Sequence, residues 1–374
     1  MRLAVPGAAV CVVLAIPGFA GAGDPQLLFD VQPPVVAVLE SGGRRDALLT
    51  LDVRNPGDKR VRVERVRLRY FEGDKPVATL DPATSIFTRA GLLSDPRVEP
   101  GANDRWEGLC LTPPTAATDR ARFEFDLAAR RGVRVLRATQ TQDVALRKPV
   151  APPVLMLPVT GPWTVSQGHA CDTNHRHGRL GGEFAWDLVA VNASGRAGTP
   201  GFESSHRNED SATFGRLVLS PIAGTVAFVT DGVDDNDGLK DFPRRSLVEA
   251  ARAPRWIFGN HVVIDRGDGV FVLLAHLQKG SIVVRPGAPV REGDELASAG
   301  NSGNSMLPHL HIQVMDHADP IHPSTFGMPA LFRDYIESSA VGEGPQSEAV
   351  FRKLAAGDPP VGAVVRTSAT GKKL

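Results

Sequence analysis

Hydrophobic and polar residues alternate along much of the first half of the chain. Residues 47–54 and 61–70 place apolar side chains at every second position, and a turn signal, Asn55-Pro56-Gly57-Asp58, separates them. A period of two is typical of a β-strand with one buried face and one face in solvent. We expect the two segments to pair as a hairpin. Further strands over 122–127 and 133–138 would complete a small sandwich of immunoglobulin-like type.

A second group of short apolar runs, rich in valine, lies in the second half of the chain. The runs cover residues 217–229, 261–265, 270–276 and 309–314. The chain has 38 Gly and 30 Pro and is only 6% aromatic, which together with the short runs favours a mainly β protein. A chain of 374 residues exceeds what one hydrophobic core usually organises, so two domains are expected.

The ends and the middle of the chain set the expected boundaries. Arg2, an apolar run over 8–16 and small residues over 18–22 are typical of a signal peptide. The predicted parts are a signal peptide (1–22), a β-sandwich domain (23–147), a Pro-rich linker (148–156), an antiparallel β-sheet domain (157–334) and a polar, loosely ordered C-terminal tail (335–374).

The predicted leader and the charge balance limit the partners of the protein. The apolar run is shorter than the ~20 residues of a membrane-spanning helix, so we expect export to the periplasm, cell envelope or exterior without stable membrane insertion. An uncleaved anchor is the alternative. Lys plus Arg and Asp plus Glu both number 42, which leaves no net field to attract nucleic acid. Nothing in the sequence indicates an oligomeric state.

Three cysteines occur, and Cys11 would be removed with the signal peptide. Cys110 and Cys171 would then remain in an oxidising compartment, where a bridge between them and two free thiols are both open.

Eight of the ten histidines fall between His169 and His311, and four residues in this region predict a metal centre. His309 and His311 are two apart in a strand pattern, so they point to the same face. Asp187 is a lone carboxylate in an apolar strand, where an unpaired charge is costly and a cation would remove the cost. An upstream imidazole, from His175 or His177, would complete the three-ligand set of a catalytic zinc.

A zinc-bound water needs a group to take its proton and a donor to stabilise the oxyanion. His276 and His309 are the available candidates. His261, beside a glycine turn, is expected to be structural. Residues 231–259 are expected to form a wall of a groove, and their acidic start lacks the spacing of an EF-hand.

These motifs, in this order, resemble the lysostaphin-type, LytM-like zinc endopeptidases, which cleave peptidoglycan cross-links or bridges. The resemblance covers about residues 175–314. Its motifs are Ala275-His276-Leu277, the loop Gly300-Asn301-Ser302-Gly303-Asn304-Ser305, and Pro308-His309-Leu310-His311, preceded by Pro221-Ile-Ala-Gly-Thr-Val226 and Val290-Arg-Glu-Gly-Asp-Glu-Leu296.

The resemblance implies an antiparallel β-sheet domain with an open groove and one zinc ion per chain. It implies Asp187 and His311 as zinc ligands, His276 and His309 as catalytic histidines, and peptidoglycan peptide stems as the partner. The expected function is therefore a zinc-dependent metalloendopeptidase that hydrolyses these stems.

The first zinc ligand is open between two histidines. The family usually has this histidine four residues before the aspartate, and here the gap is longer. His175 and His177 would face the same way in an extended chain, so strand parity does not separate them. His177 needs less looping to reach the metal and is followed by Gly178, which favours it over His175.

Two other functions account for part of the sequence. Residues 221–226 and 284–294 resemble a lipoyl or biotinyl carrier hairpin, but no lysine lies at a hairpin tip between them. A catalytically silent LytM-like protein, which binds cell wall or activates amidases, would have lost zinc ligands, and this chain retains a full set.

Overall fold

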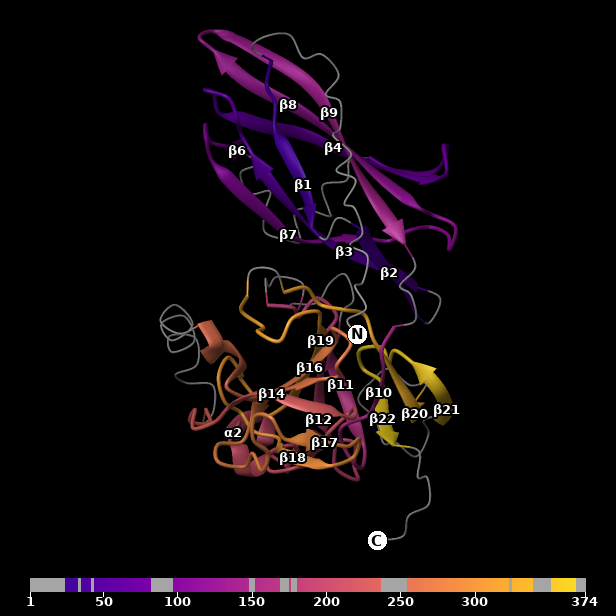
Figure 1. The fold of residues 1–374 in the computed structure, drawn as a ribbon, viewed down its shortest axis with the longest axis vertical. Coiled ribbons are helices and arrows are strands. Elements are labelled where there is room, and N and C mark those ends of the chain that lie inside the picture. The colour runs from indigo at the N-terminus through magenta and orange to yellow at the C-terminus, as the bar shows by residue number, and fades with distance from the viewer. Residues whose placement is uncertain are drawn as a thin grey trace, which may run out of the picture.

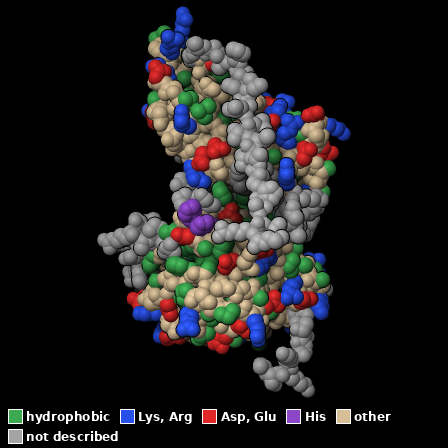
Figure 2. All heavy atoms as spheres, in the orientation of Figure 1, with side chains coloured by type: hydrophobic (Ala, Val, Ile, Leu, Met, Phe, Trp, Pro, Cys, Tyr) green, Lys and Arg blue, Asp and Glu red, His purple; other side chains and the backbone are tan. Residues whose placement is uncertain are grey.

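The computed structural model describes residues 24–32, 35–41, 44–81, 97–147, 152–168, 175, 180–236, 254–322, 325–338 and 351–367. It is mostly β, with 53% strand and 4% helix, which confirms the predicted class. Figure 1 shows the N-terminal strands gathered in one body and the later strands in a second body. Lys or Arg and Asp or Glu side chains are interspersed on the face drawn in Figure 2, with no large area of one sign.

Nine strands form the N-terminal sheet system, in the order β1-β3-β2-β9-β8-β4-β5, with β6 paired to β4 and β7 to β3. Their bounds are β1 Leu28–Gln32, β2 Val35–Ser41, β3 Arg44–Arg54, β4 Val61–Glu72, β5 Lys75–Leu80, β6 Arg97–Val98, β7 Asn103–Leu111, β8 Arg120–Arg131 and β9 Arg134–Arg147.

The strands β3 and β4 were predicted correctly, but the hairpin between them is wrong. β3 pairs with β1, β2 and β7, whereas β4 pairs with β5, β6 and β8. The connection from β3 to β4 joins the two groups of strands. It is held by the buried side chain of Asn55, which donates to the carbonyls of Lys59 and Val98. Both groups contribute to one core that includes Leu51 and Phe125. The immunoglobulin-like type stays a prediction.

A second sheet of eleven strands carries the order β10-β20-β22-β11-β12-β19-β16-β15-β14-β17, with β21 paired to β20. β13 and β18 form a separate pair. The strands are β10 Val154–Met156, β11 Trp163–Gln167, β12 Trp186–Ala190, β13 Leu217–Leu219, β14 Gly224–Thr230, β15 Asn260–Asp265, β16 Phe271–Leu277, β17 Pro289–Val290, β18 Glu295–Ser298, β19 Leu310–Met315, β20 Leu331–Ser338, β21 Phe351–Gly357 and β22 Val364–Thr367. The helices within the described residues are α2 Phe202–Ser205, η2 Asn208–Asp210 and η3 Pro254–Phe258.

The predicted linker and tail differ from the structure. β10 was assigned to the linker, yet it pairs in parallel with β20. Within the described part of the predicted tail, β21 and β22 both pair with β20, and Tyr335 and Val365 are fully buried in the core of this sheet. These strands are short and mix apolar with charged residues, so the pattern of the sequence did not separate them from a polar tail.

The two bodies meet at a small apolar cluster of Leu48, Cys110, Phe184 and Leu331. Cys110 is disulfide-bonded, and both other cysteines lie outside the described residues. Among the described residues, no helix has the length and hydropathy needed to cross a membrane. The predicted signal peptide also lies outside the described residues.

Candidate metal centre and catalytic histidines

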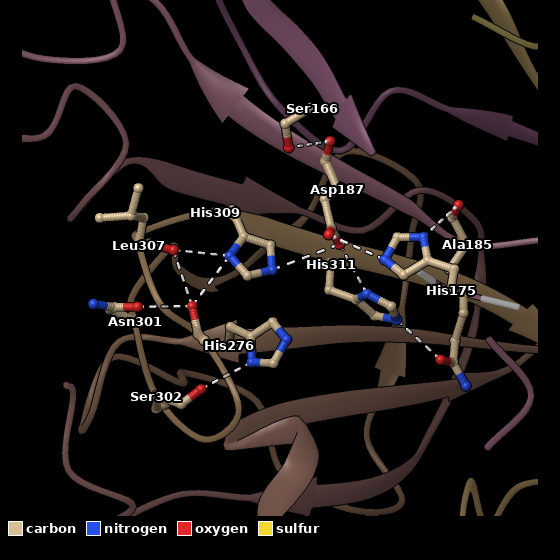
Figure 3. A network of polar contacts seen from close by, with 12 residues as sticks. Ser166, His175, Ala185, Asp187, His276, Asn301, Ser302, Leu307, His309 and His311 are labelled. Atoms are coloured by element: carbon tan, nitrogen blue, oxygen red, sulfur yellow. Dashed lines mark hydrogen bonds and ion pairs between the residues drawn. The ribbon is translucent and has the colours of Figure 1, made fainter. Parts of the chain in front are cut away.

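Three residues bring their ligand atoms together in the middle of the second sheet. His175, Asp187 and His311 each offer one atom, and these atoms all lie within 4.8 Å of one another. His175 Nε2 lies 3.0 Å from Asp187 Oδ2, and His311 Nδ1 lies 2.9 Å from Asp187 Oδ1. Figure 3 shows both rings directed at the carboxylate.

The register of two antiparallel strands places Asp187 beside His311. The two residues are direct partners in the pairing of β12 with β19. Their neighbours Trp186, Leu188 and Ile312 are fully buried in the core on the opposite face of the sheet. Because side chains alternate along a strand, this burial turns the carboxylate and the imidazole to the same face.

Each of the two imidazoles has an acceptor at both ring nitrogens. His175 Nδ1 lies 3.2 Å from the Ala185 carbonyl, and His311 Nε2 lies 3.0 Å from Gln313 Oε1. The Gln313 oxygen is assigned because its Nε2 donates to the Leu180 carbonyl at 2.7 Å. Without a metal, each ring would need protons on both nitrogens to bond the Asp187 carboxylate as well.

A divalent cation resolves this arrangement. Each neutral ring would keep the proton that faces its outer acceptor and turn its bare nitrogen to the metal, which is the usual environment of a metal-bound histidine. The donor set therefore fits a zinc ion, with two imidazole nitrogens and one carboxylate.

Electrostatics inside the site favour an ionised carboxylate. Burial raises the pKa of Asp187, but the opposing charge of His175 and the hydrogen bonds from His175 and His311 outweigh it and hold that pKa well below the ordinary value. Burial lowers the pKa of His175, and the opposing charge of Asp187 raises it above the ordinary value.

Two further histidines line the same space. His309 Nε2 lies 3.6 Å from Asp187 Oδ1, and the rings of His276 and His309 have centroids 4.6 Å apart. His309 Nδ1 lies 2.9 Å from the Leu307 carbonyl, and His276 Nδ1 lies 2.8 Å from the Ser302 carbonyl. A carbonyl only accepts, so in both rings Nδ1 carries the proton and Nε2 presents a lone pair.

Burial lowers the pKa of His309 and places the pKa of His276 well below its ordinary value. Both rings are therefore neutral near pH 7 and able to accept a proton at Nε2.

His276 reaches the site through a break in strand alternation. Val272 and Leu274 belong to the main core, Ala275 packs in a smaller cluster on the other face, and Leu277 is again in the main core. His276 has φ 59°, a left-handed conformation that histidine adopts more readily than most residues. This single residue shifts the phase of the strand, so that Ala275 and His276 both face the site.

The structure gathers His175, Asp187, His276, His309 and His311, all of which were predicted. His177, the preferred first ligand, lies outside the described residues, and the position beside Asp187 is taken by His175. His261 is buried, with Nδ1 2.8 Å from the Gly259 carbonyl, as expected for a structural histidine.

Sequence reasoning missed the residues that orient the histidines. Gln313 supports His311, and Ser305 Oγ lies 3.1 Å from His309 Nδ1. Gln313 had a usable signal, because it continues the same-face pattern of His309 and His311 as a polar residue inside an apolar strand. The Ser302 carbonyl had no signal, because a backbone acceptor is independent of residue type.

A comparison with protein families matches residues 205–323 to the model described as Peptidase family M23. The match covers this segment of the chain, which is similar to the peptidase domain of that family. His276, His309 and His311 lie inside the matched residues, whereas His175 and Asp187 precede them.

Curated relatives align with a short stretch of the chain. DD-carboxypeptidase/endopeptidase Mpg of Neisseria meningitidis is 33% identical over 72 residues, 19% of this chain and 16% of that protein. Peptidoglycan DD-endopeptidase ShyA of Vibrio cholerae is 32% identical over 71 residues, also 19% of this chain and 16% of that protein. The chain thus spans about a sixth of the length of these relatives.

Solved structures include the catalytic domain of the M23 protein EnpA from Enterococcus faecalis, with TM-score 0.28, 16% identity and coverage of 47% of this chain and 94% of that chain. The catalytic domain of lysostaphin from Staphylococcus simulans has TM-score 0.24, 15% identity and coverage of 43% and 84%. TM-scores this low support no transfer of function.

Proposed function

We propose that this protein is a zinc-dependent metalloendopeptidase that hydrolyses peptide cross-links or bridges of bacterial peptidoglycan. The observation that carries the proposal is the pair of imidazoles, His175 and His311, which share the Asp187 carboxylate and have acceptors behind both rings. A site for a structural ion would not need two further neutral histidines beside it. The M23 match supports the reaction class.

In this proposal His175, Asp187 and His311 hold one zinc ion, so His175 replaces His177 as the first ligand. Zinc held by three protein ligands supplies Lewis-acid activation of water and of the scissile carbonyl. His276 and His309 accept and return protons at Nε2, because their Nδ1 atoms are committed to the Ser302 and Leu307 carbonyls. After protonation, either imidazolium can donate to the oxyanion of the tetrahedral intermediate.

The substrate class rests on what the relatives are named for. ShyA is a peptidoglycan DD-endopeptidase and Mpg a DD-carboxypeptidase/endopeptidase. We infer the same polymer here, reached after export, and an open groove over the site, since a cross-linked polymer cannot enter a closed pocket. The domain division into an N-terminal sandwich and a peptidase body is part of the same proposal.

The test is digestion of purified sacculi by the full chain. Mass spectrometry should identify released fragments cut within the peptide stems, and a zinc chelator should stop their release until zinc is restored. Release that a chelator does not affect would contradict the zinc mechanism. Binding to sacculi without release of any fragment would favour a catalytically silent wall-binding protein instead.

A further inference from the structure

The acidic segment that begins at Asp231 was predicted to form a wall of a groove, and its described residues also contact the loop 301–305. Its described part ends at Asn236, which is only 5% exposed, and Asp235 forms an isolated antiparallel bridge with Ser302. The rest of the segment, up to residue 253, lies outside the described residues. Asp235 and Asn236 therefore pack against the loop 301–305.

That loop supplies an acceptor to each of the two proposed catalytic histidines, and the Leu307 carbonyl just beyond it supplies a further acceptor to His309. The Ser302 carbonyl lies 2.8 Å from His276 Nδ1, and Ser305 Oγ lies 3.1 Å from His309 Nδ1. Ser305 Oγ is also 2.7 Å from Asn301 Oδ1, so it can donate there and accept from His309. A displacement of this loop would take an acceptor away from each ring and so weaken the control of ring orientation and tautomer.

The loop is held from within by one side-chain amide. Asn236 Nδ2 lies 2.9 Å from the Asn301 carbonyl, 2.8 Å from the Gly303 carbonyl and 2.9 Å from the Ser305 carbonyl. One main-chain bond and one side-chain bond add to this: Asn236 N donates to the Asn301 carbonyl at 2.9 Å, and the side-chain Nδ2 of Asn301 donates back to the Asn236 carbonyl at 2.9 Å. Asp235 Oδ1 accepts from Asn301 N at 2.7 Å.

We propose that Asn236 is a positioning residue, which sets the Nδ1-protonated tautomers of His276 and His309 by fixing the loop 301–305. This proposal rests on the proposed function for the roles of the two histidines. Three carbonyls converge on a group with two N–H bonds, in a buried site where unpaired carbonyls are costly. No other common side chain of this size offers two donors and no charge.

The test compares Asn236→Ala with Asn55→Ala in the full chain. Asn55 is a matched control, because it is also a buried asparagine whose amide bridges two backbone carbonyls, but it lies in the connection between β3 and β4 of the N-terminal body. Asn236→Ser, which keeps one donor, is included in case the alanine variant does not fold.

In Asn236→Ala we expect kcat on sacculi to fall on the order of 100-fold, as for a small misplacement of catalytic groups, with KM and zinc content unchanged. Asn236→Ser should lie between this variant and the parent, and Asn55→Ala should keep the parental kcat. Nitrogen NMR of histidine-labelled protein, assigned with His276 and His309 variants, should show Nδ1-protonated rings in the parent and mixed tautomers in Asn236→Ala.

The NMR measurement of the tautomers does not depend on catalytic activity. Parental tautomers together with a parental kcat in Asn236→Ala and Asn236→Ser would overturn the positioning role, even if the enzyme is active. A parent protein that digests no sacculi, but whose two tautomers change in Asn236→Ala and not in Asn55→Ala, would remove the proposed function and leave the loop-positioning role supported.

Discussion

Asp187 and His311 are the second residues of two paired strands, whereas the acceptors that orient His276 and His309 belong to the irregular loop 301–305 and its neighbour Leu307. In the first region a core on the opposite face of the sheet fixes which way the side chains point. In the second region, hydrogen bonds between loops fix them. Metal binding should therefore respond to changes in the strands, and proton transfer to changes in the loop.

The largest effect is expected from His311→Ala. The change removes one of three protein ligands and leaves the buried Asp187 carboxylate without the His311 imidazole. We expect loss of zinc and of all chelator-sensitive activity, measured by elemental analysis and by digestion of sacculi. A His311→Ala protein that keeps stoichiometric zinc would contradict the ligand assignment.

His276→Asn tests the second region, where hydrogen bonds from loops orient the histidines. Asparagine tolerates the left-handed conformation at this position but cannot act as a base near neutral pH. Turnover should fall about 100- to 10,000-fold while zinc content stays at the parental level. A metal-free His276→Asn protein would mean that a ligand had been mistaken for a catalytic group.

A smaller effect is expected from Gln313→Ala. Gln313 is nearly fully buried, and its oxygen lies 3.0 Å from His311 Nε2, on the side of the ring away from Asp187. Loss of such a supporting contact usually weakens metal binding about 10- to 100-fold. A competition titration with a zinc chelator measures the shift. Unchanged affinity would show that strand register alone orients His311.

The smallest effect on the site should come from Ile312→Val, which changes the core face of the same strand. Removal of one buried methylene typically costs about 0.5–1.5 kcal/mol of unfolding free energy. Denaturant unfolding should show this loss with zinc content and kcat unchanged. A fall in zinc content would mean that core packing and ligand geometry are coupled more tightly than alternation on a strand implies.

The same contrast explains what the sequence could predict. The pattern of apolar residues predicted the strands that carry Asp187 and His311, because a strand buried in a core has the sequence of a short apolar run. It did not predict that β3 and β4 belong to different groups of strands, since a turn signal does not specify which strands pair. It also did not predict the strands β21 and β22, whose short segments mix apolar and charged residues.

The residues of the candidate site also differ in how far the sequence predicts them. His276 was named from its motif, but parity alone would have placed it on the core face, and only its positive φ brings it to the metal side. The loop-length argument favoured His177, yet the structure shows His175 beside Asp187, supported by the Ala185 carbonyl. Loop length measures the entropy of closure and carries no information about which ring finds an acceptor behind it.

The central claim is that His175, Asp187 and His311 form the zinc centre. It is tested most directly by the zinc content of the parent, His175→Ala and His177→Ala proteins, purified side by side and measured by elemental analysis. The account predicts one zinc ion per chain in the parent and in His177→Ala, and none in His175→Ala. Full zinc in His175→Ala with loss in His177→Ala would contradict it.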